Sequence, residues 1–408
     1  MSKIRIMPND HWDWSMPVKF SQGWKVGNLV FVGGQISADR HGRTIGKDDI
    51  ATQTRNVFEH IRTVLRAAGA DLSDIVRLNT YYHHSGDGAE VTRFWEEMTR
   101  VRMEYIADPG PAATAVRVSG FAFEGLLIEI EAIAAIGPKT RLMPKNHWDW
   151  SMPVKFSQGW KVENLVFVGG QISADNRGRT IGKGDIATQT RNVFESIRRV
   201  LEEGGARMSD IVKLNTYYTP RAKGVELKKF WEEMTKVRLE YVADPGPAAT
   251  AVPVEGFAFE DLLIEVEAIA AIGPKQRLMP KSHWDWSIPV PFSQGWKVGD
   301  LIFVGGQVSA DGRGNPVDKG DLGAQTRNVL QFVQSVLHEA GADMKDLVKL
   351  NTYYQAEGQG AEVTKTWEAM TAVRMAHLAD PGPAGTAVRI PALGYDGLLI
   401  EIEGIAAV

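Results

Sequence analysis

The pattern of hydrophobic and polar positions predicts strands and helices in the first third of the chain. The apolar run at 29–32 is typical of a strand, and the alternating residues 24–26 join it through Gly27 and Asn28 as a hairpin. Apolar residues at helical spacing predict one helix from Asp48 or Asp49 to Gly69 and a second over 89–106. Strand-like segments cover 75–82, 113–118 and 126–135. The predicted order is strand, strand, helix, strand, helix, strand, strand.

This pattern occurs three times without gaps. The motif HWDWS begins at His11, His147 and His283, so the step is 136 residues, and three such steps account for all 408 residues. A unit of this length has the size of a domain and is too long for a solenoid repeat. We therefore expect three domains, at 1–136, 137–272 and 273–408, called copies one, two and three below.

The order of elements in each copy predicts an α+β fold, in which two helices cover one face of a sheet. The other face also needs a cover, because a sheet with an exposed apolar face is not stable in water. The two sister copies can supply that cover.

Composition narrows the class of protein. The chain has 24% charged residues, a net charge of −4 and no Cys, which excludes disulfides and a thiolate nucleophile. The sequence has no basic stripe of the kind that indicates a nucleic-acid partner. No apolar run reaches the roughly 18 residues of a membrane helix, and the first residues lack the apolar core of a signal peptide. We expect a cytoplasmic protein that acts on a small molecule.

Four segments of copy one resemble the RidA family, also called YjgF: GNLVFVGGQIS, QTRNVFEHIRTVLRAAGADLSDIVRLNTYY, PAATAVRV and LLIEIEAIA. The resemblance implies a chorismate-mutase-like sheet and a trimer with its sheets inward and its helices outward. It also implies a pocket between neighbouring subunits that hydrolyses enamines and imines to ketones and ammonia without a cofactor. One chain would then form a pseudo-threefold trimer, which could remain monomeric in solution.

Glu129 and Glu131 alternate with isoleucines and so share one face of a strand. A carboxylate beside an imine carbon could hold the attacking water or relay a proton. The alternative is a salt-bridged strand face. The resemblance favours Glu129 as the catalytic residue, together with its equivalents Glu265 and Glu401.

Two further sets of residues are candidates for substrate binding. Glycine pairs end an apolar strand and could let backbone N–H groups approach a substrate oxygen; they are Gly33 and Gly34, Gly169 and Gly170, and Gly305 and Gly306. The resemblance places an aromatic pocket wall at Phe20, Phe156 and Phe292, where many relatives have Tyr. The alternatives are a strand-ending bulge and ordinary core packing.

The HWDW motif adds His11 and Trp14, His147 and Trp150, and His283 and Trp286. A His could transfer protons near neutral pH, and a Trp could stack on a flat substrate. The alternative is an aromatic clamp between copies. One His and one Asp per copy do not make a metal ligand set.

The sequence departs from the family pattern at one position that matters for substrate binding. Family members carry an Arg after Pro-Ala that binds the substrate carboxylate, but Ala113, Ala249 and Gly385 stand there. Activity on small 2-imino acids is therefore expected to be weak. Arg117 and Arg389, four residues further on, could compensate, although Pro253 replaces them in copy two. The alternative is an exposed Arg at a strand end.

We expect a deaminase that acts on an enamine or imine, with a conjugated substrate of the 2-aminomuconate kind. Two alternatives remain. One is a binding protein without catalysis. The other is a cyclic amidohydrolase using Ser37 and Lys25, which recur but belong to no common motif.

Overall fold

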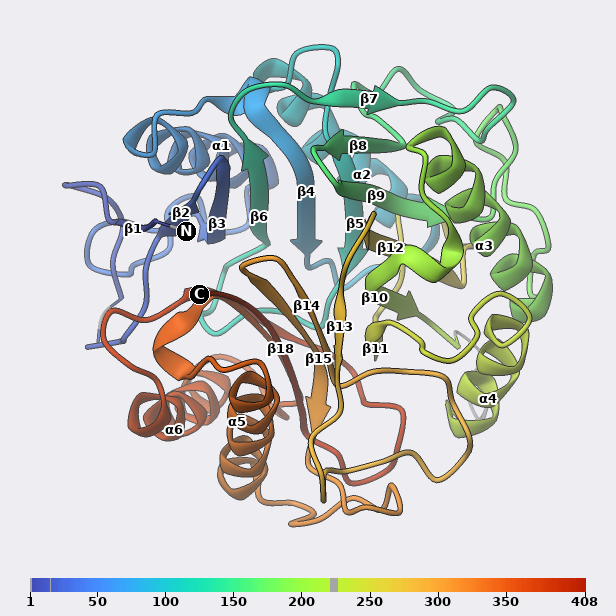
Figure 1. Ribbon diagram of the computed structural model, residues 1–408. Coiled ribbons are helices and arrows are strands. Elements are labelled where there is room, and N and C mark those ends of the chain that lie inside the picture. Colours follow the sequence, from blue (N-terminus) through green and yellow to red (C-terminus); the bar gives the residue numbers. More distant parts are fainter. Residues whose placement is uncertain (1, 15, 221–226) are drawn as a thin grey trace.

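A computed structural model of the protein describes residues 2–14, 16–220 and 227–408. Within these residues the chain forms three six-stranded sheets, one from each copy. Long helices cover the outside of the molecule, and the strands face its centre (Figure 1).

The elements recur in the same order in each copy. Copy one contains β1 (Lys3–Ile6), β2 (Gly23–Val26), β3 (Leu29–Ile36), α1 (Ile50–Ala67), β4 (Ile75–Tyr82), α2 (Gly88–Tyr105), β5 (Ala112–Arg117) and β6 (Ile128–Ala135). Copy two contains β7 (Thr140–Leu142), β8 (Gly159–Val162), β9 (Leu165–Ile172), α3 (Ile186–Glu203), β10 (Ile211–Tyr218), α4 (Leu227–Arg238), β11 (Ala248–Pro253) and β12 (Ile264–Ala271). Copy three contains β13 (Gln276–Leu278), β14 (Gly295–Val298), β15 (Leu301–Val308), α5 (Leu322–Glu339), β16 (Leu347–Tyr354), α6 (Ala361–His377), β17 (Ala384–Arg389) and β18 (Ile400–Ala407).

The first sheet has the strand order β1-β2-β3-β6-β4-β5, and the other two repeat it. Only β4 and β5 run parallel; the other neighbours in this sheet are antiparallel. The sequence did not predict the short edge strand β1, which pairs with β2 alone. Its burial does not alternate, because Ile4 and Arg5 are both exposed and Ile6 is buried, and four residues give too short a pattern to recognise.

The helices form where the sequence provides a cap and an apolar stripe. Asp49 precedes α1, and its side chain accepts a hydrogen bond from the backbone N–H of Thr52. Val57, Ile61 and Val64 then recur on one face and are completely buried against the sheet. This confirms the expected helix and its expected start.

The inner faces of the three sheets cover one another. Phe31, Phe167 and Phe303, one from each β3-type strand, lie in a single apolar cluster on the pseudo-threefold axis. The ring is closed, because Ser21 of copy one donates its backbone N–H to the carbonyl of Pro383 in copy three at 3.0 Å. The expected α+β pseudo-trimer is confirmed.

Candidate active site

A small cavity lies at the junction of copies one and three, with a volume of about 30 Å³. Copy one contributes Phe20, Gly34 and Glu129, and copy three contributes Arg374 and Ala387. Two copies are therefore needed to build it.

The junction of copies two and one repeats this arrangement with a cavity of about 20 Å³, where Phe156 and Glu265 face Arg102 and Ala115. At the third junction, Ala251 of copy two contacts Glu401 of copy three in the same way. We call these three places the junction sites.

Glu129 occupies the inner wall of its junction site. It extends from β6, and its Oε1 accepts a hydrogen bond from the backbone N–H of Ala387 in β17 at 3.4 Å. The equivalent bonds to Glu265 and Glu401 have the same length.

Burial, followed by the charge of Glu131, raises the pKa of Glu129 to about 8. Burial raises the pKa of Glu401 to about 8 as well, and that of Glu265 well above its ordinary value. Near neutral pH a substantial share of these carboxyl groups carries a proton.

Gly34 lies directly under this carboxyl group. A Cβ built on Gly34 would overlap Oε1 of Glu129, and the same is true of Gly170 with Glu265 and of Gly306 with Glu401. The second glycine of each pair therefore makes room for the carboxyl.

The first glycine of each pair has another neighbour. Gly33 packs against the backbone of Gly385, and its N–H donates to the carbonyl of Gln22 at 2.9 Å. The same bond is 2.9 Å for Gly169 and 2.8 Å for Gly305. These N–H groups are used within the fold, so they are not the free oxyanion donors that we expected.

Glu131 and its equivalents face the pseudo-threefold axis and not the junction sites. Lys349 donates to Glu131 at 2.7 Å, Lys213 pairs with Glu403, and Arg77 pairs with Glu267. Each pair joins two copies. Burial would raise the pKa of Glu403, but the charge and hydrogen bond of Lys213 hold it below its ordinary value. For Glu131 and its equivalents, the alternative of a salt-bridged strand face is therefore correct.

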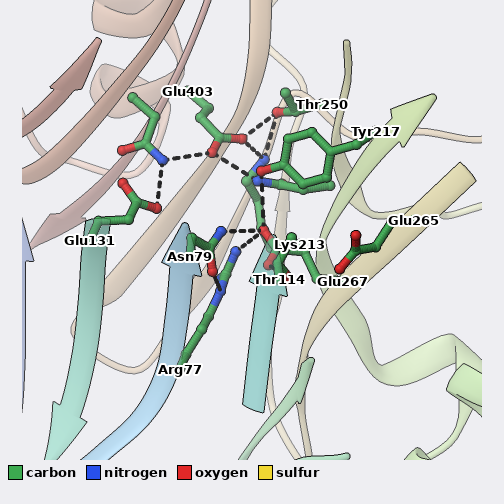
Figure 2. A network of polar contacts seen from close by, with 12 residues as sticks. Arg77, Asn79, Thr114, Glu131, Lys213, Tyr217, Thr250, Glu265, Glu267 and Glu403 are labelled. Atoms are coloured by element: carbon green, nitrogen blue, oxygen red, sulfur yellow. Dashed lines mark hydrogen bonds and ion pairs between the residues drawn. The ribbon is translucent and has the colours of Figure 1, made fainter. Parts of the chain in front are cut away.

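Figure 2 shows this network around Glu267 and Glu403, with Thr114 and Thr250 donating to the same carboxylates. Glu265 lies in the same view, and no dashed line joins it to the network. The two carboxylates of one strand thus have different surroundings, although they point from the same face.

Aromatic rings close the junction sites. Phe20 stacks on Trp12 with 5.8 Å between ring centroids, and Trp14 packs on Trp367 of copy three at 4.9 Å. Trp148, Trp150 and Phe156 repeat this wall in copy two. In copy three, Phe292 stacks on Trp284, and Trp286 packs on Trp231. Each HWDW motif therefore forms an aromatic clamp between copies, and those of copies one and two line the cavities at their junctions.

The histidine of each HWDW motif contacts a buried glutamine of its own copy. Nε2 of His11 lies 2.8 Å from Oε1 of Gln35, and His147 and His283 make the same contact with Gln171 and Gln307. Burial lowers the pKa of all three rings. His11 is not among the residues that line the cavity at its junction.

Arg117 and Arg389 lie away from the glutamates. Arg117 donates to the carbonyl of Glu255 at 2.7 Å and lines an outer cavity of about 330 Å³. Arg389 lines the equivalent outer cavity of about 620 Å³, which shares Phe121, Phe123 and Leu126 with the junction site behind it. Both arginines therefore line the outer cavities and not the junction sites, and whether they bind substrate stays a prediction.

Sequence reasoning missed Arg102, Arg238 and Arg374. Arg102 continues the buried helix stripe of Val91, Trp95 and Met98, and a charged residue on such a stripe was the available signal. The structure places Arg102 and Arg374 in the junction sites.

Ser37 and Lys25 do not form a catalytic pair. Ser37 donates to the carbonyl of Ile45 at 2.8 Å, whereas Lys25 donates to the carbonyl of Ala68 beyond the end of α1 at 2.9 Å. This removes the support for an amidohydrolase.

No helix among the described residues is long and apolar enough to cross a membrane. The part of the chain that the structure describes also contains no group of three or more His, Asp or Glu side chains placed to hold a metal ion.

The fold and the junction sites define a class of protein: a ring of three α+β units with one buried carboxyl group at each junction. The family model described as Endoribonuclease L-PSP matches residues 15–136, 151–272 and 287–408. The chain belongs to this family, which is the RidA family that its sequence resembles.

Individual relatives agree with this assignment. A RutC family protein of Pyrococcus abyssi is 43% identical over 28% of this chain and 84% of its own length. The mitochondrial protein mmf1 of Schizosaccharomyces pombe is 35% identical over 28% of this chain and 67% of its own length. Among solved structures, a chorismatase is similar over 82% of this chain and 93% of its own, with a TM-score of 0.54 and 15% identity. That last likeness concerns the fold alone.

Proposed function

We propose that the protein hydrolyses enamines or imines to carbonyl compounds and ammonia, that the copies 1–136, 137–272 and 273–408 act as its domains, and that each junction site is an active site. The observation that carries this proposal is the cavity between two copies that holds Glu129, whose pKa burial raises to about 8. Membership of the RidA family supports the same reaction class.

Glu129 would act in both of its protonation states. The protonated carboxyl donates to the nitrogen of an imine, and the resulting carboxylate accepts a proton from water as the water oxygen bonds to the imine carbon. The carboxyl, now protonated again, donates to the amine nitrogen of this adduct as the carbon–nitrogen bond breaks. Ammonia leaves, the hydroxyl proton returns to the carboxylate, and a ketone remains. With an enamine, the same carboxyl protonates the carbon, which gives the protonated imine directly, and the carboxylate left behind then accepts the proton from water. The acid and base steps return Glu129 to its starting state.

The size of the cavity bears on the substrate. A volume of about 30 Å³ for the cavity leaves little space beside Phe20 and Trp14. Even a small imine such as 2-iminobutanoate needs this aromatic wall to move, and a conjugated molecule of the 2-aminomuconate kind needs a larger movement, so the proposal favours small imines. A deaminase of this kind needs a small-molecule substrate as its only partner, and a cytoplasmic location remains our expectation.

The test is ammonia release from imines generated in the assay, for example 2-iminobutanoate. We expect release above the spontaneous rate with the natural chain and only the spontaneous rate with the triple variant Glu129→Gln, Glu265→Gln and Glu401→Gln. Binding of the carbonyl product without any ammonia release would favour the non-catalytic binding protein. A folded triple variant of full activity would exclude these carboxyl groups from the reaction.

A further inference from the structure

Each junction site contains a buried guanidinium from a helix of the neighbouring copy. Arg102 lies on α2, Arg238 on α4 and Arg374 on α6, at equivalent positions of the three copies. Arg238 and Arg374 are each 8% exposed. Their positions on the apolar stripe of each helix direct the side chains toward the sheet and not toward water.

These guanidinium groups lack the partners that buried cations ordinarily have. The Nε of all three is buried and has no hydrogen-bond partner among the described residues. Arg102 donates to the carbonyl of Lys155, and Arg238 to that of Pro291, each at 3.3 Å. No described carboxylate forms an ion pair with these two residues.

Burial lowers the pKa of Arg102 and Arg238 to about 10, so both stay cationic at neutral pH. A buried cation without a counter-ion is costly for the fold, which indicates that an anion completes the site.

Arg374 lies beside Gly385, a small residue of the neighbouring strand. Its Nη2 lies 3.8 Å from the point that a Cβ on Gly385 would occupy. Gly385, Ala113 and Ala249 stand where the family resemblance places the carboxylate-binding Arg. A long side chain in place of Gly385 would lie against the guanidinium of Arg374.

Arg374 also faces the reacting group. It lines the same cavity as Glu129, and its charge is among the influences that lower the pKa of that carboxyl, although burial outweighs them. A planar guanidinium is suited to a carboxylate, which it can bind through two parallel hydrogen bonds.

We propose that Arg102, Arg238 and Arg374 bind the carboxylate of the substrate, so that the preferred substrates are small 2-imino or 2-enamino acids. This inference rests on the proposed function for the reaction, but not for the binding of the anion. It also replaces our expectation of weak activity on small 2-imino acids, because that expectation assumed that no cation remained in the site.

Binding can be measured without catalysis by calorimetry with 2-oxobutanoate, the carbonyl product of 2-iminobutanoate. The natural chain should bind it at three sites, and Arg374→Met should weaken one site by about ten- to a hundredfold, the effect of losing a charge-assisted hydrogen bond. The triple variant of Arg102, Arg238 and Arg374 to Met should weaken all three. Arg100→Met removes an exposed charge from the same helix and should leave binding unchanged.

The junction geometry gives a second test, on activity. Glu129→Gln combined with Arg374→Met damages one site, whereas Glu129→Gln combined with Arg102→Met damages two. We expect the first variant to keep about two-thirds of the rate and the second about one-third. Equal rates for the two double variants would overturn the proposal.

The two tests separate this inference from the proposed function. Binding of 2-oxobutanoate that depends on the arginines, without ammonia release, would support the anion site and reject the deaminase. Ammonia release with an unchanged KM in the triple Met variant would support the deaminase and overturn the anion site. Absence of 2-oxobutanoate binding to the natural chain would also overturn it. If the Met variants do not fold, the Arg→Lys series carries the same test, because lysine keeps the charge but lacks the two-pronged geometry.

Discussion

Glu129 accepts a hydrogen bond from the backbone N–H of Ala387, a residue 258 positions later in the chain, at 3.4 Å. The carboxyl group belongs to copy one and the donor to copy three. The same contact recurs at the other two junctions. No copy therefore contains a complete site, although each supplies a part of two sites.

The raised pKa values of the three glutamates predict a dependence of stability on pH. Between the ordinary value of 4.5 and about 8, the folded chain keeps protons on Glu129 and Glu401 that the unfolded chain has lost. Stability from these groups is therefore complete below pH 4.5 and decreases as the pH rises toward 8. The difference in melting temperature between the natural chain and the triple Gln variant should change in that window. The other titrating groups are common to both chains and cancel. A difference that stays constant with pH would show that these carboxyl groups are not held protonated.

Gly34→Ala should damage the junction site through the carboxyl that lies above it. The added Cβ would overlap Glu129, so we expect a loss of about 1–3 kcal/mol in the free energy of unfolding and loss of activity at that junction. Gly323→Ala is the matched control, because copies one and two have Ala at the equivalent positions of the helix. It should stabilise the chain by about 0.5–1 kcal/mol. A neutral Gly34→Ala would mean that the carboxyl can move aside freely.

The axial ion pairs should be sensitive to the loss of one partner. Arg77→Met leaves the buried carboxylate of Glu267 without its cation, and we expect a cost of about 3–5 kcal/mol in the free energy of unfolding. Adding Glu267→Gln removes the unpaired charge and should restore part of the stability, because the amide oxygen can still accept from Asn79 and the new NH2 group can donate to the hydroxyl of Thr114. Urea unfolding of the two variants measures both effects. Equal losses for the single and the double variant would contradict a buried, charged Glu267.

The hairpin turn of copy two offers a gain in stability. Glu163 has a φ of +52°, whereas the equivalent residues of the sister copies are Gly27 and Gly299 at +58° and +55°. The left-handed conformation costs a residue with a Cβ about 1–2 kcal/mol relative to Gly. Glu163→Gly should raise the free energy of unfolding by about 1 kcal/mol, and Gly27→Glu should lower it by a similar amount. Thermal unfolding of the pair checks both signs.

Much of the fold followed from local pattern. The segment 75–82 was predicted as a strand and is β4 with the same bounds, and Asp49, one of the two expected helix starts, caps α1. These elements have a strong period and a clear start or end. The first strand of each copy was missed, because its stability comes from pairing with the next strand and not from its own residues.

The site was less accessible to sequence reasoning. Glu129 and Glu131 were correctly placed on one face, but only the packing of three copies assigns one to a junction and the other to the axis. Arg102 was missed because an Arg on a helix stripe acquires a meaning only when a neighbouring copy closes over it. Whether Glu129 acts in catalysis stays a prediction.

The most direct test of the account is the initial rate of ammonia release from 2-iminobutanoate as the glutamates are replaced one at a time. The account predicts a loss of about one-third with Glu129→Gln, of about two-thirds when Glu265→Gln is added, and a return to the spontaneous rate with Glu401→Gln as well. A folded triple variant that releases ammonia as fast as the natural chain would contradict it.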